Sequence, residues 1–221
     1  MKRLGMTVLL VSVVGSVVMA QSNVDPAHKF AWSENIGWTN WRDANEIAQG
    51  VNVGATFLMG LIWTENAGWI NAGDGTPGAL CGEQPCYANL DGTDFGVNVD
   101  VDGTLHGYAW GENIGWINFD TAALEENRAR FDLCERRFFG FAWGENVGWI
   151  NLDDAATHVA VGPCVFADAD CDGNVAGDDY AFFSTLLSGP GADVDCPVFD
   201  HDGDGDVDLL DFAVLQTVFA G

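Results

Sequence analysis

The chain has 221 residues and a formal net charge of −25 at neutral pH, from 33 acidic and only 8 basic side chains. This length is enough for one medium-sized domain and one small domain. So large an excess of negative charge argues against binding to nucleic-acid phosphates and favours the binding of cations. The acids are concentrated near the end of the sequence, because residues 165–221 contain 13 Asp and no Lys or Arg.

The first residues have the pattern of a secretory signal peptide. Two basic residues precede an apolar run over residues 6–19, and small side chains precede a predicted cleavage site after Ala20. The run is shorter than the roughly 20 residues that a membrane-spanning helix needs. We predict a signal peptide over residues 1–20 and a mature chain with no membrane span, secreted or held at the surface of a bacterial cell. An uncleaved anchor is the alternative.

One motif recurs four times. Its pattern is Trp-x-Glu-Asn-x-Gly-Trp-x-Asn, and the copies lie at residues 31–40, 62–71, 109–118 and 142–151. Asn and Gly tolerate the left-handed backbone of a tight reversal, so each copy predicts a turn with a Trp on either side. The repeat resembles one seen in secreted bacterial proteins, and this likeness implies a shared fold and no particular chemistry.

The residues between and around the motifs read as strands and turns. Period-two alternation and turn dipeptides are clearest in the third and fourth units, where strands are expected at residues 97–101, 104–110, 116–119, 129–134, 138–143 and 149–152. We predict that residues 21–163 form an antiparallel all-β domain of four pseudo-repeats, each a hairpin or a three-stranded unit. A propeller, a prism, a sandwich and a roll are all compatible with the pattern.

Three segments of this domain do not follow the repeat. Residues 21–30 read as a short polar lead-in. Residues 72–93 lengthen the gap between the second and third motifs and read as a loop insertion. Residues 120–130 are rich in Ala and Glu and predict one short helical turn or an exposed loop.

Eight of the nine Trp residues lie in the motifs, and Trp41 is the exception. A buried Trp removes about 150–250 Å² of surface from water. We therefore predict that the eight motif indoles supply a large share of the core of the β domain. The alternative is that they are exposed and bind carbohydrate, because Trp and Asn are common contacts of sugars.

Each motif also contains a Glu, and these are Glu34, Glu65, Glu112 and Glu145. A glycoside hydrolase needs a pair of carboxyl groups, so such an enzyme is a further alternative. One catalytic site, however, needs unequal environments for its acid and its base. Four equivalent Glu in four equivalent turns therefore favour a structural role, and we assign no catalytic residue.

All six Cys follow the predicted cleavage site, and an even number of Cys in a secreted chain indicates disulfides. A zinc site is the alternative, but the paired CxxC spacing that it needs is missing. Proximity along the sequence predicts the pairs Cys81–Cys86, Cys134–Cys164 and Cys171–Cys196.

Two twelve-residue stretches, residues 168–179 and 200–211, have the spacing of calcium loops. Calcium takes six to eight oxygen ligands, which such a loop supplies from side chains at positions 1, 3, 5 and 12 and from the backbone carbonyl at position 7. Two loops in the same register argue against a chance cluster of acids. The predicted ligands of two calcium ions are Asp168, Asp170, Asp172, the Asn174 carbonyl and Asp179 in the first loop, and Asp200, Asp202, Asp204, the Asp206 carbonyl and Asp211 in the second.

Each loop is followed by an amphipathic segment that predicts a helix, over residues 178–187 and 209–219. With Asp at position 12 of both loops and an offset of 32 residues between them, residues 164–221 resemble a type I dockerin. The resemblance implies a small helical module that holds two calcium ions and docks to a cohesin-like or other extracellular protein. Loop positions 10 and 11 help to choose the partner in that family, and here they are Gly177, Asp178, Leu209 and Leu210.

These features together predict a secreted calcium-binding protein in which the C-terminal module tethers the β-repeat module to an extracellular or cell-surface partner. Dockerins accompany polysaccharide-degrading machinery, so the resemblance also connects the chain with polysaccharide breakdown. A carbohydrate-binding β module is the first alternative, and a glycoside hydrolase that uses the motif Glu residues is the second.

Overall fold

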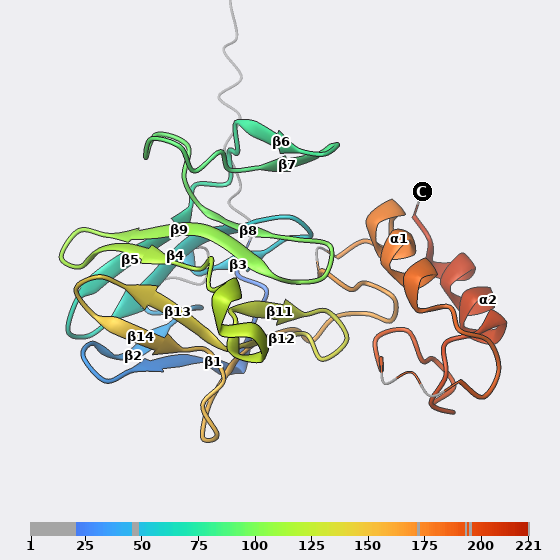
Figure 1. Cartoon of the computed structure of the whole chain (residues 1–221). Helices are drawn as coiled ribbons and strands as arrows, with labels where there is room; N and C mark the ends of the chain where they lie inside the picture. Colours follow the sequence, from blue (N-terminus) through green and yellow to red (C-terminus); the bar gives the residue numbers. More distant parts are fainter. Residues whose placement is uncertain (1–20, 46–48, 172, 193, 195, 221) are drawn as a thin grey trace, which may run out of the picture.

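The computed structural model describes residues 21–45, 49–171, 173–192, 194 and 196–220 (Figure 1). The predicted signal peptide lies outside these described residues. Within them, no helix combines the length and the apolar character that crossing a bilayer would require.

In the described part of the chain, eight strands form a closed antiparallel β-barrel (Figure 1). Each strand pairs with its neighbour along the chain, and the last pairs with the first, so the barrel leaves no open edge. The antiparallel all-β prediction is confirmed, and the architecture is a barrel, which was not among the four predicted arrangements. The strands are β1 (Val24–Ser33), β2 (Gly37–Asn40), β4 (Leu58–Thr64), β5 (Gly68–Gly73), β9 (Leu105–Gly111), β10 (Gly115–Asn118), β13 (Phe141–Gly144) and β14 (Gly148–Asn151).

Each motif copy forms one hairpin of the barrel, and its two Trp residues lie directly opposite each other on the paired strands. The ring centroids of each pair are 4.5–4.7 Å apart. This spacing and a tilted or edge-on geometry are what aromatic pairs prefer. The four cross-strand pairs are Trp32 with Trp38, Trp63 with Trp69, Trp110 with Trp116, and Trp143 with Trp149.

The prediction that the motif indoles form the core is wrong, because all eight lie on the outer face of the barrel. Five of them expose 36–46% of their surface, and the other three are half-buried. Successive side chains of a strand point to opposite faces, so the residues beside each Trp fill the interior. The interior cross-strand pairs are Ala31 with Thr39, Ile62 with Ile70, Ala109 with Ile117, and Ala142 with Ile150.

Trp41 is the one Trp that the barrel buries, with 1% of its surface exposed. It follows the last residue of β2, and the same alternation that places the motif Trp outside places Trp41 inside. Its ring lies 5.2 Å from the ring of Phe138 and 6.3 Å from that of Phe119. Its indole N–H donates a 3.0 Å hydrogen bond to the Thr39 hydroxyl. Trp41 therefore closes the end of the core that lies away from the motif turns.

The four motif turns are joined into a ring by their Asn side chains. Each Asn amide donates a hydrogen bond of 3.0–3.3 Å to a backbone carbonyl in the neighbouring turn, and the last turn returns to the first. The accepting residue in each turn is a buried apolar one that plugs this end of the barrel. The donor and acceptor pairs are Asn66 to Ile36, Asn113 to Ala67, Asn146 to Ile114, and Asn35 to Val147.

Replacing Asn113 with alanine is expected to lower the free energy of unfolding by about 1–2 kcal/mol, because the carbonyl of Ala67 loses its donor at a partly buried site. Glu112→Ala is the matched control, since its exposed side chain accepts no hydrogen bond from a described residue. That change should stay within about 0.5 kcal/mol. Urea unfolding of both variants measures the difference. Equal stability of the two would show that the ring of turns contributes nothing.

The remaining strands are β3 (Asn52–Val53), β6 (Ala79–Cys81), β7 (Gln84–Cys86), β8 (Val97–Val99), β11 (Arg130–Asp132), β12 (Arg137–Phe139) and β15 (Val159–Val161). Five of them extend the barrel sheet at its sides, and β6 and β7 form a separate two-stranded sheet. The predicted insertion at residues 72–93 contains the β6–β7 hairpin, which projects away from the barrel (Figure 1). The segment at residues 120–130 contains a short 3-10 helix, η2 (Ala122–Asn127).

Two local predictions are wrong. Residues 21–30 are not a lead-in, because residues 24–30 belong to β1, where they pair with β15 and β2. The single strand expected at residues 138–143 is divided into β12 and β13 at Gly140. Gly140 has a φ of +77°, and a Cβ atom there would lie 2.1 Å from the carbonyl oxygen of Arg128. The chain therefore turns at this glycine, so that β12 pairs with β11 and β15 whereas β13 pairs with β10 and β14.

The C-terminal module contains two helices, α1 (Gly177–Leu186) and α2 (Leu209–Val218). Both fall within one residue of their predicted bounds. Phe183, Phe199 and Leu215 are buried in a core that is separate from that of the barrel. Leu133, in the turn between β11 and β12, packs against both cores and so joins the two parts.

The disulfides join the parts differently from the prediction. Cys81–Cys86 is confirmed, but the other two pairs are Cys134–Cys196 and Cys164–Cys171. The β11–β12 turn extends toward the C-terminal module and brings Cys134 to Cys196, 62 residues away in sequence. Nearness along the chain could not indicate this contact. The helical module is therefore bonded covalently to the barrel.

Candidate functional site

The first predicted calcium loop is organised by two aspartates. The Asp179 carboxylate accepts hydrogen bonds from the backbone N–H groups of Ala169 (2.7 Å) and Ala176 (2.8 Å). The Asp168 carboxylate accepts one from Gly173 (3.1 Å). The last residue of the loop thus accepts hydrogen bonds from the backbone at positions 2 and 9, and the first residue accepts one from the backbone at position 6.

The second loop repeats these three bonds at positions 32 residues further along the chain. Asp211 accepts hydrogen bonds from the N–H groups of His201 (2.7 Å) and Asp208 (2.8 Å). Asp200 accepts one from Gly205 (3.0 Å). The two loops therefore share one backbone plan, in which aspartates at both ends of the loop hold the backbone around the remaining acids.

The acidic side chains gather into three groups. In each group, one carboxylate oxygen per residue lies within 4.8 Å of the others. All members of the first and third groups are buried. The groups are Asp168 with Asp170 and Asp179, Asp200 with Asp202 and Asp204, and Asp206 with Asp208 and Asp211.

The remaining predicted ligands are placed differently. Asp172 lies outside the described residues, and Asn174 is exposed. Asp211 groups with Asp206 and Asp208 and not with the three acids at the start of its loop. The sequence did not indicate a role for the Asp206 side chain. One of its oxygens accepts a hydrogen bond from the Gly191 N–H, and the other is buried without a partner among the described residues.

The electrostatics of the first group favour a cation. Burial raises the pKa of Asp179, two backbone hydrogen bonds oppose that rise, and the charges of Asp178 and Asp168 add to it. Among the described residues, no lysine or arginine forms a salt bridge with an aspartate of either loop. The positive charge of Arg136 acts on Asp168 and Asp179, but one guanidinium does not balance three clustered carboxylates. Burying the excess negative charge is costly unless a cation binds it. Hard oxygen donors at this spacing suit calcium.

The four predicted partner-binding residues are exposed, but the two halves of the module face different surroundings. Asp178 lines a cleft of about 410 Å³ between α1 and the barrel, together with Val101 and Phe182. Leu209 and Leu210, at the start of α2, expose 69% and 62% of their surface. Figure 1 shows α2 on the side of the module away from the barrel. The second half therefore presents the more accessible apolar face.

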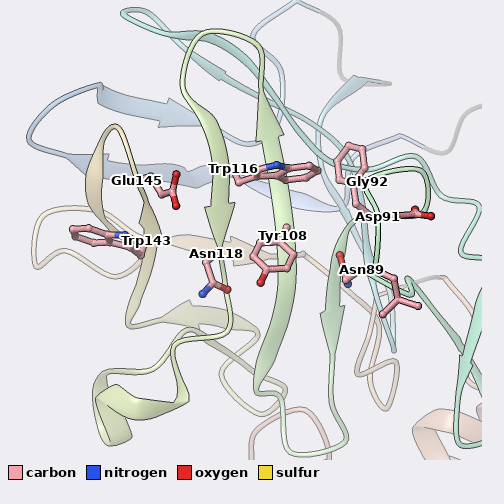
Figure 2. A pocket seen from close by; sticks show the side chains of 10 residues that line it. Asn89, Asp91, Gly92, Tyr108, Trp116, Asn118, Trp143 and Glu145 are labelled. Carbon is pink, nitrogen blue, oxygen red and sulfur yellow. The ribbon is translucent and has the colours of Figure 1, made fainter.

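Two clefts on the outer face of the barrel have volumes of about 570 and 590 Å³. Both lie where one motif hairpin meets the next. The first is lined by the motif residues Trp116, Asn118, Trp143 and Glu145 (Figure 2), and the second by Trp38, Asn40, Trp63 and Glu65. The same four motif positions therefore form both clefts.

Sequence reasoning missed the residues that deepen these clefts. In the first, the segment at residues 89–95, just after the β6–β7 hairpin, forms one wall, and Tyr108 lies below Trp116 (Figure 2). In the second, Phe30 and the segment at residues 156–157 take these places. One signal was present: in every motif, Glu and Asn flank the Trp residues, which suits a solvent-facing surface better than a core.

The fold and these sites together define a closed β-barrel with outward-facing tryptophans, attached to a small helical module with two acidic loops. Comparison of the chain with protein-family models, with curated proteins and with solved structures finds no match in any of the three.

Proposed function

We propose that this protein is a secreted calcium-binding protein whose C-terminal module docks the barrel to an extracellular or cell-surface partner. One observation carries the proposal: two loops 32 residues apart repeat the same three side-chain to backbone hydrogen bonds around clustered carboxylates. Chance acidic turns would not share this plan. Calcium would balance the excess negative charge of the clustered carboxylates.

The proposal assigns the holding of the ions to the residues of the loops. Asp168, Asp170 and Asp179 serve the first ion, and Asp200, Asp202 and Asp204 begin the second site. Asp179 and Asp211 each join the loop to the helix that follows it. The docking surface is the start of α2, because Leu209 and Leu210 are large apolar side chains without cover. A cohesin-like domain is the partner that the resemblance implies.

The barrel enters the proposal as a rigid body of four pseudo-repeats. This view is supported by the four identical Trp–Trp pairings and by the ring of turn hydrogen bonds. The four motif Glu side chains occupy equivalent exposed positions. We therefore propose binding and display, without an enzymatic activity for these residues.

Calorimetric titration of the purified protein is expected to show two calcium ions per chain. Asp179→Asn and Asp211→Asn should each abolish one binding event, because each change removes the charge and one oxygen of a position 12 carboxylate. Asp178→Asn is the matched control, because this exposed neighbour belongs to none of the acidic groups. Calcium uptake that is absent, or that is unaffected by both position 12 variants, would refute the calcium sites.

The docking part of the proposal uses the same samples. The calcium-loaded protein, but not the chelated protein, should bind an immobilised cohesin domain. The double variant Leu209→Ala and Leu210→Ala should lose this binding while still taking up two ions. Retention of full binding by the double variant would exclude this face of α2 as the docking surface.

A further inference from the structure

The two outer-face clefts arise from the way in which the hairpins meet. At each of these junctions, the last Asn of one motif lies opposite the first Trp of the next, as Asn40 does with Trp63 and Asn118 with Trp143. At each junction this Asn and this Trp therefore share the outer face. The second Trp of the motif that contains the Asn lies beside them. Every cleft of this kind has two indoles at its sides and an amide between them.

In the first cleft, the indole of Trp116 is held in place on several sides. Its ring lies 4.6 Å from Trp110, 5.1 Å from Phe95 and 5.9 Å from Tyr108, all edge-on. The loop at residues 89–95 packs closely against it, since a Cβ atom at Gly92 would lie 3.3 Å from the ring. A ring fixed in this way loses little entropy when a ligand packs on it.

The opposite side of the first cleft is formed by Trp143, with Glu145 and Asn118 between the two indoles (Figure 2). Trp116 and Trp143 each expose 38% of their surface. Among the ring contacts of the described residues, Trp143 pairs with Trp149 and not with Trp116. The cleft therefore offers two separate aromatic surfaces joined by a polar floor.

The second cleft repeats this arrangement with different flanking segments. Trp38 exposes 46% of its surface and lies 6.4 Å from the ring of Phe30, which takes the place that Tyr108 has in the first cleft. The wall at residues 156–157 is fixed by a 3.3 Å hydrogen bond from the Thr157 hydroxyl to the Phe30 carbonyl. Two unrelated loops thus enclose the same four motif positions.

The charge of the clefts limits the kind of ligand. Neither lining contains a lysine or an arginine, whereas Glu145 and Asp91 line the first cleft and Glu65 lines the second. An anionic ligand would meet like charge. An aromatic cage for a cation places several ring faces around one point, and among the described residues no ring contact joins Trp116 with Trp143. A neutral ligand with both apolar faces and many hydroxyl groups fits.

We propose that these two clefts bind chains of neutral sugars. The C–H groups on the flat face of a pyranose ring carry partial positive charge, which complements the negative face of an indole. Sugar hydroxyls donate hydrogen bonds to the Glu carboxylates. Each Asn amide bonds within its own chain segment, Asn118 to Asp120 and Asn40 to Asp43, and keeps a second N–H for a sugar oxygen. A chain that spans two indoles places consecutive sugar units on Trp116 and Trp143, and likewise on Trp38 and Trp63. This binding is independent of the calcium loops.

The position of the clefts gives the expected stoichiometry. Around the closed barrel, the β2–β4 junction and the β10–β13 junction are separated by four strands in either direction. The clefts therefore lie on opposite sides of the barrel, and one saccharide chain cannot fill both unless it wraps around the molecule. The protein is expected to bind two short oligosaccharides.

Calorimetry of the calcium-loaded full chain with cellohexaose, xylohexaose and maltohexaose tests the proposal. At least one of these neutral probes should bind at two sites. The double variant Trp116→Ala and Trp143→Ala should retain one site, and so should the matched double variant Trp38→Ala and Trp63→Ala. The quadruple variant should retain none. Each lost site is expected to weaken at least about tenfold, which corresponds to about 1.4 kcal/mol.

A second variant keeps the test independent of folding defects. Glu145→Ala removes an exposed side chain without a described hydrogen bond, so it should leave the thermal midpoint unchanged while weakening the first site several-fold. No binding of any of the three hexasaccharides would overturn the proposal. Binding that is unaffected by both double variants would also overturn it, as would binding of tetramethylammonium alone. None of these results would bear on calcium uptake.

Discussion

Trp41→Ala is expected to lower the free energy of unfolding of the barrel by about 3–5 kcal/mol, the usual cost of deleting a fully buried large aromatic side chain. Trp41 is 1% exposed and packs against Phe119 and Phe138. Its removal leaves a cavity at the closed end of the core. It also leaves the hydroxyl of Thr39 without its indole donor in a buried position. Both effects destabilise the folded state.

Trp149→Ala is the matched control for Trp41→Ala. This motif Trp exposes 46% of its surface, and its main described contact is the edge-on pairing with Trp143. Its loss should cost about 1 kcal/mol, the value of one aromatic cross-strand pair. Urea unfolding, followed by far-ultraviolet circular dichroism, compares the two variants. A larger loss for Trp149→Ala than for Trp41→Ala would place the core where the sequence predicted it, on the motif indoles.

The contrast between these tryptophans shows what the alternation of side chains along a strand can predict. Alternation correctly indicates which residues share a face, so Trp38 with Asn40 and Thr39 with Trp41 could be grouped from the sequence alone. It does not say which face is inside. Size and hydrophobicity favoured the indoles as the core. Between the paired motif strands the interior instead takes the smaller Ala, Ile and Thr side chains, and Trp41 is the one indole in the core. An eight-stranded barrel has an interior just wide enough for side chains to fill it.

The closure of the barrel also could not be predicted from the sequence pattern. Each motif predicts one hairpin, but the junctions between hairpins depend on contacts between residues of different motifs, such as Asn40 opposite Trp63. The ring of turn hydrogen bonds links Asn35 to Val147 across 112 residues. Short-range alternation contains no information on such contacts. For the same reason, proximity gave the pair Cys81–Cys86 correctly and the other two disulfides wrongly.

The two helices of the C-terminal module were predicted well because the information that places them is local. A fixed spacing of aspartates and glycines within twelve residues determines the turn, and the helices α1 and α2 begin where the spacing predicts. The arrangement of the aspartate side chains was harder to predict from the sequence. The grouping of Asp206 with Asp208 and Asp211, and the capping of α2 by the Asp208 carboxylate (2.6 Å to the Leu210 N–H), depend on how the loop meets its helix.

The covalent attachment of the C-terminal module bears on the docking that we propose. In the described structure the module is held by Cys134–Cys196 and by the shared packing of Leu133. Arg136 adds three hydrogen bonds, to the backbone carbonyls of Cys164 (3.4 Å), Val165 (3.1 Å) and Asp168 (2.7 Å). A partner bound to α2 would therefore hold the barrel, and the clefts on its surface, in a fixed orientation.

Removal of calcium is expected to unfold the C-terminal module without releasing it from the barrel. When the free calcium concentration is about 1,000 times the dissociation constant of a site, binding of that ion stabilises the folded module by about 4 kcal/mol. A module of this size has too small a core to compensate for that loss, and its clustered carboxylates then repel one another. A chelator should therefore abolish the circular dichroism signal of α1 and α2, while the fluorescence of the barrel tryptophans stays unchanged.

Limited proteolysis separates unfolding from release. With chelator alone, cleavage within residues 173–192 should leave the C-terminal fragment bound to the barrel on a non-reducing gel, because Cys134–Cys196 still joins them. Chelator with a reductant should free the fragment. The variant Cys134→Ser and Cys196→Ser should lose the fragment with chelator alone, and it is the matched control for reduction. Helical signal and protease resistance that survive chelation would show that the module is stable without bound ions, which would leave its clustered aspartates without the role that we assign to them.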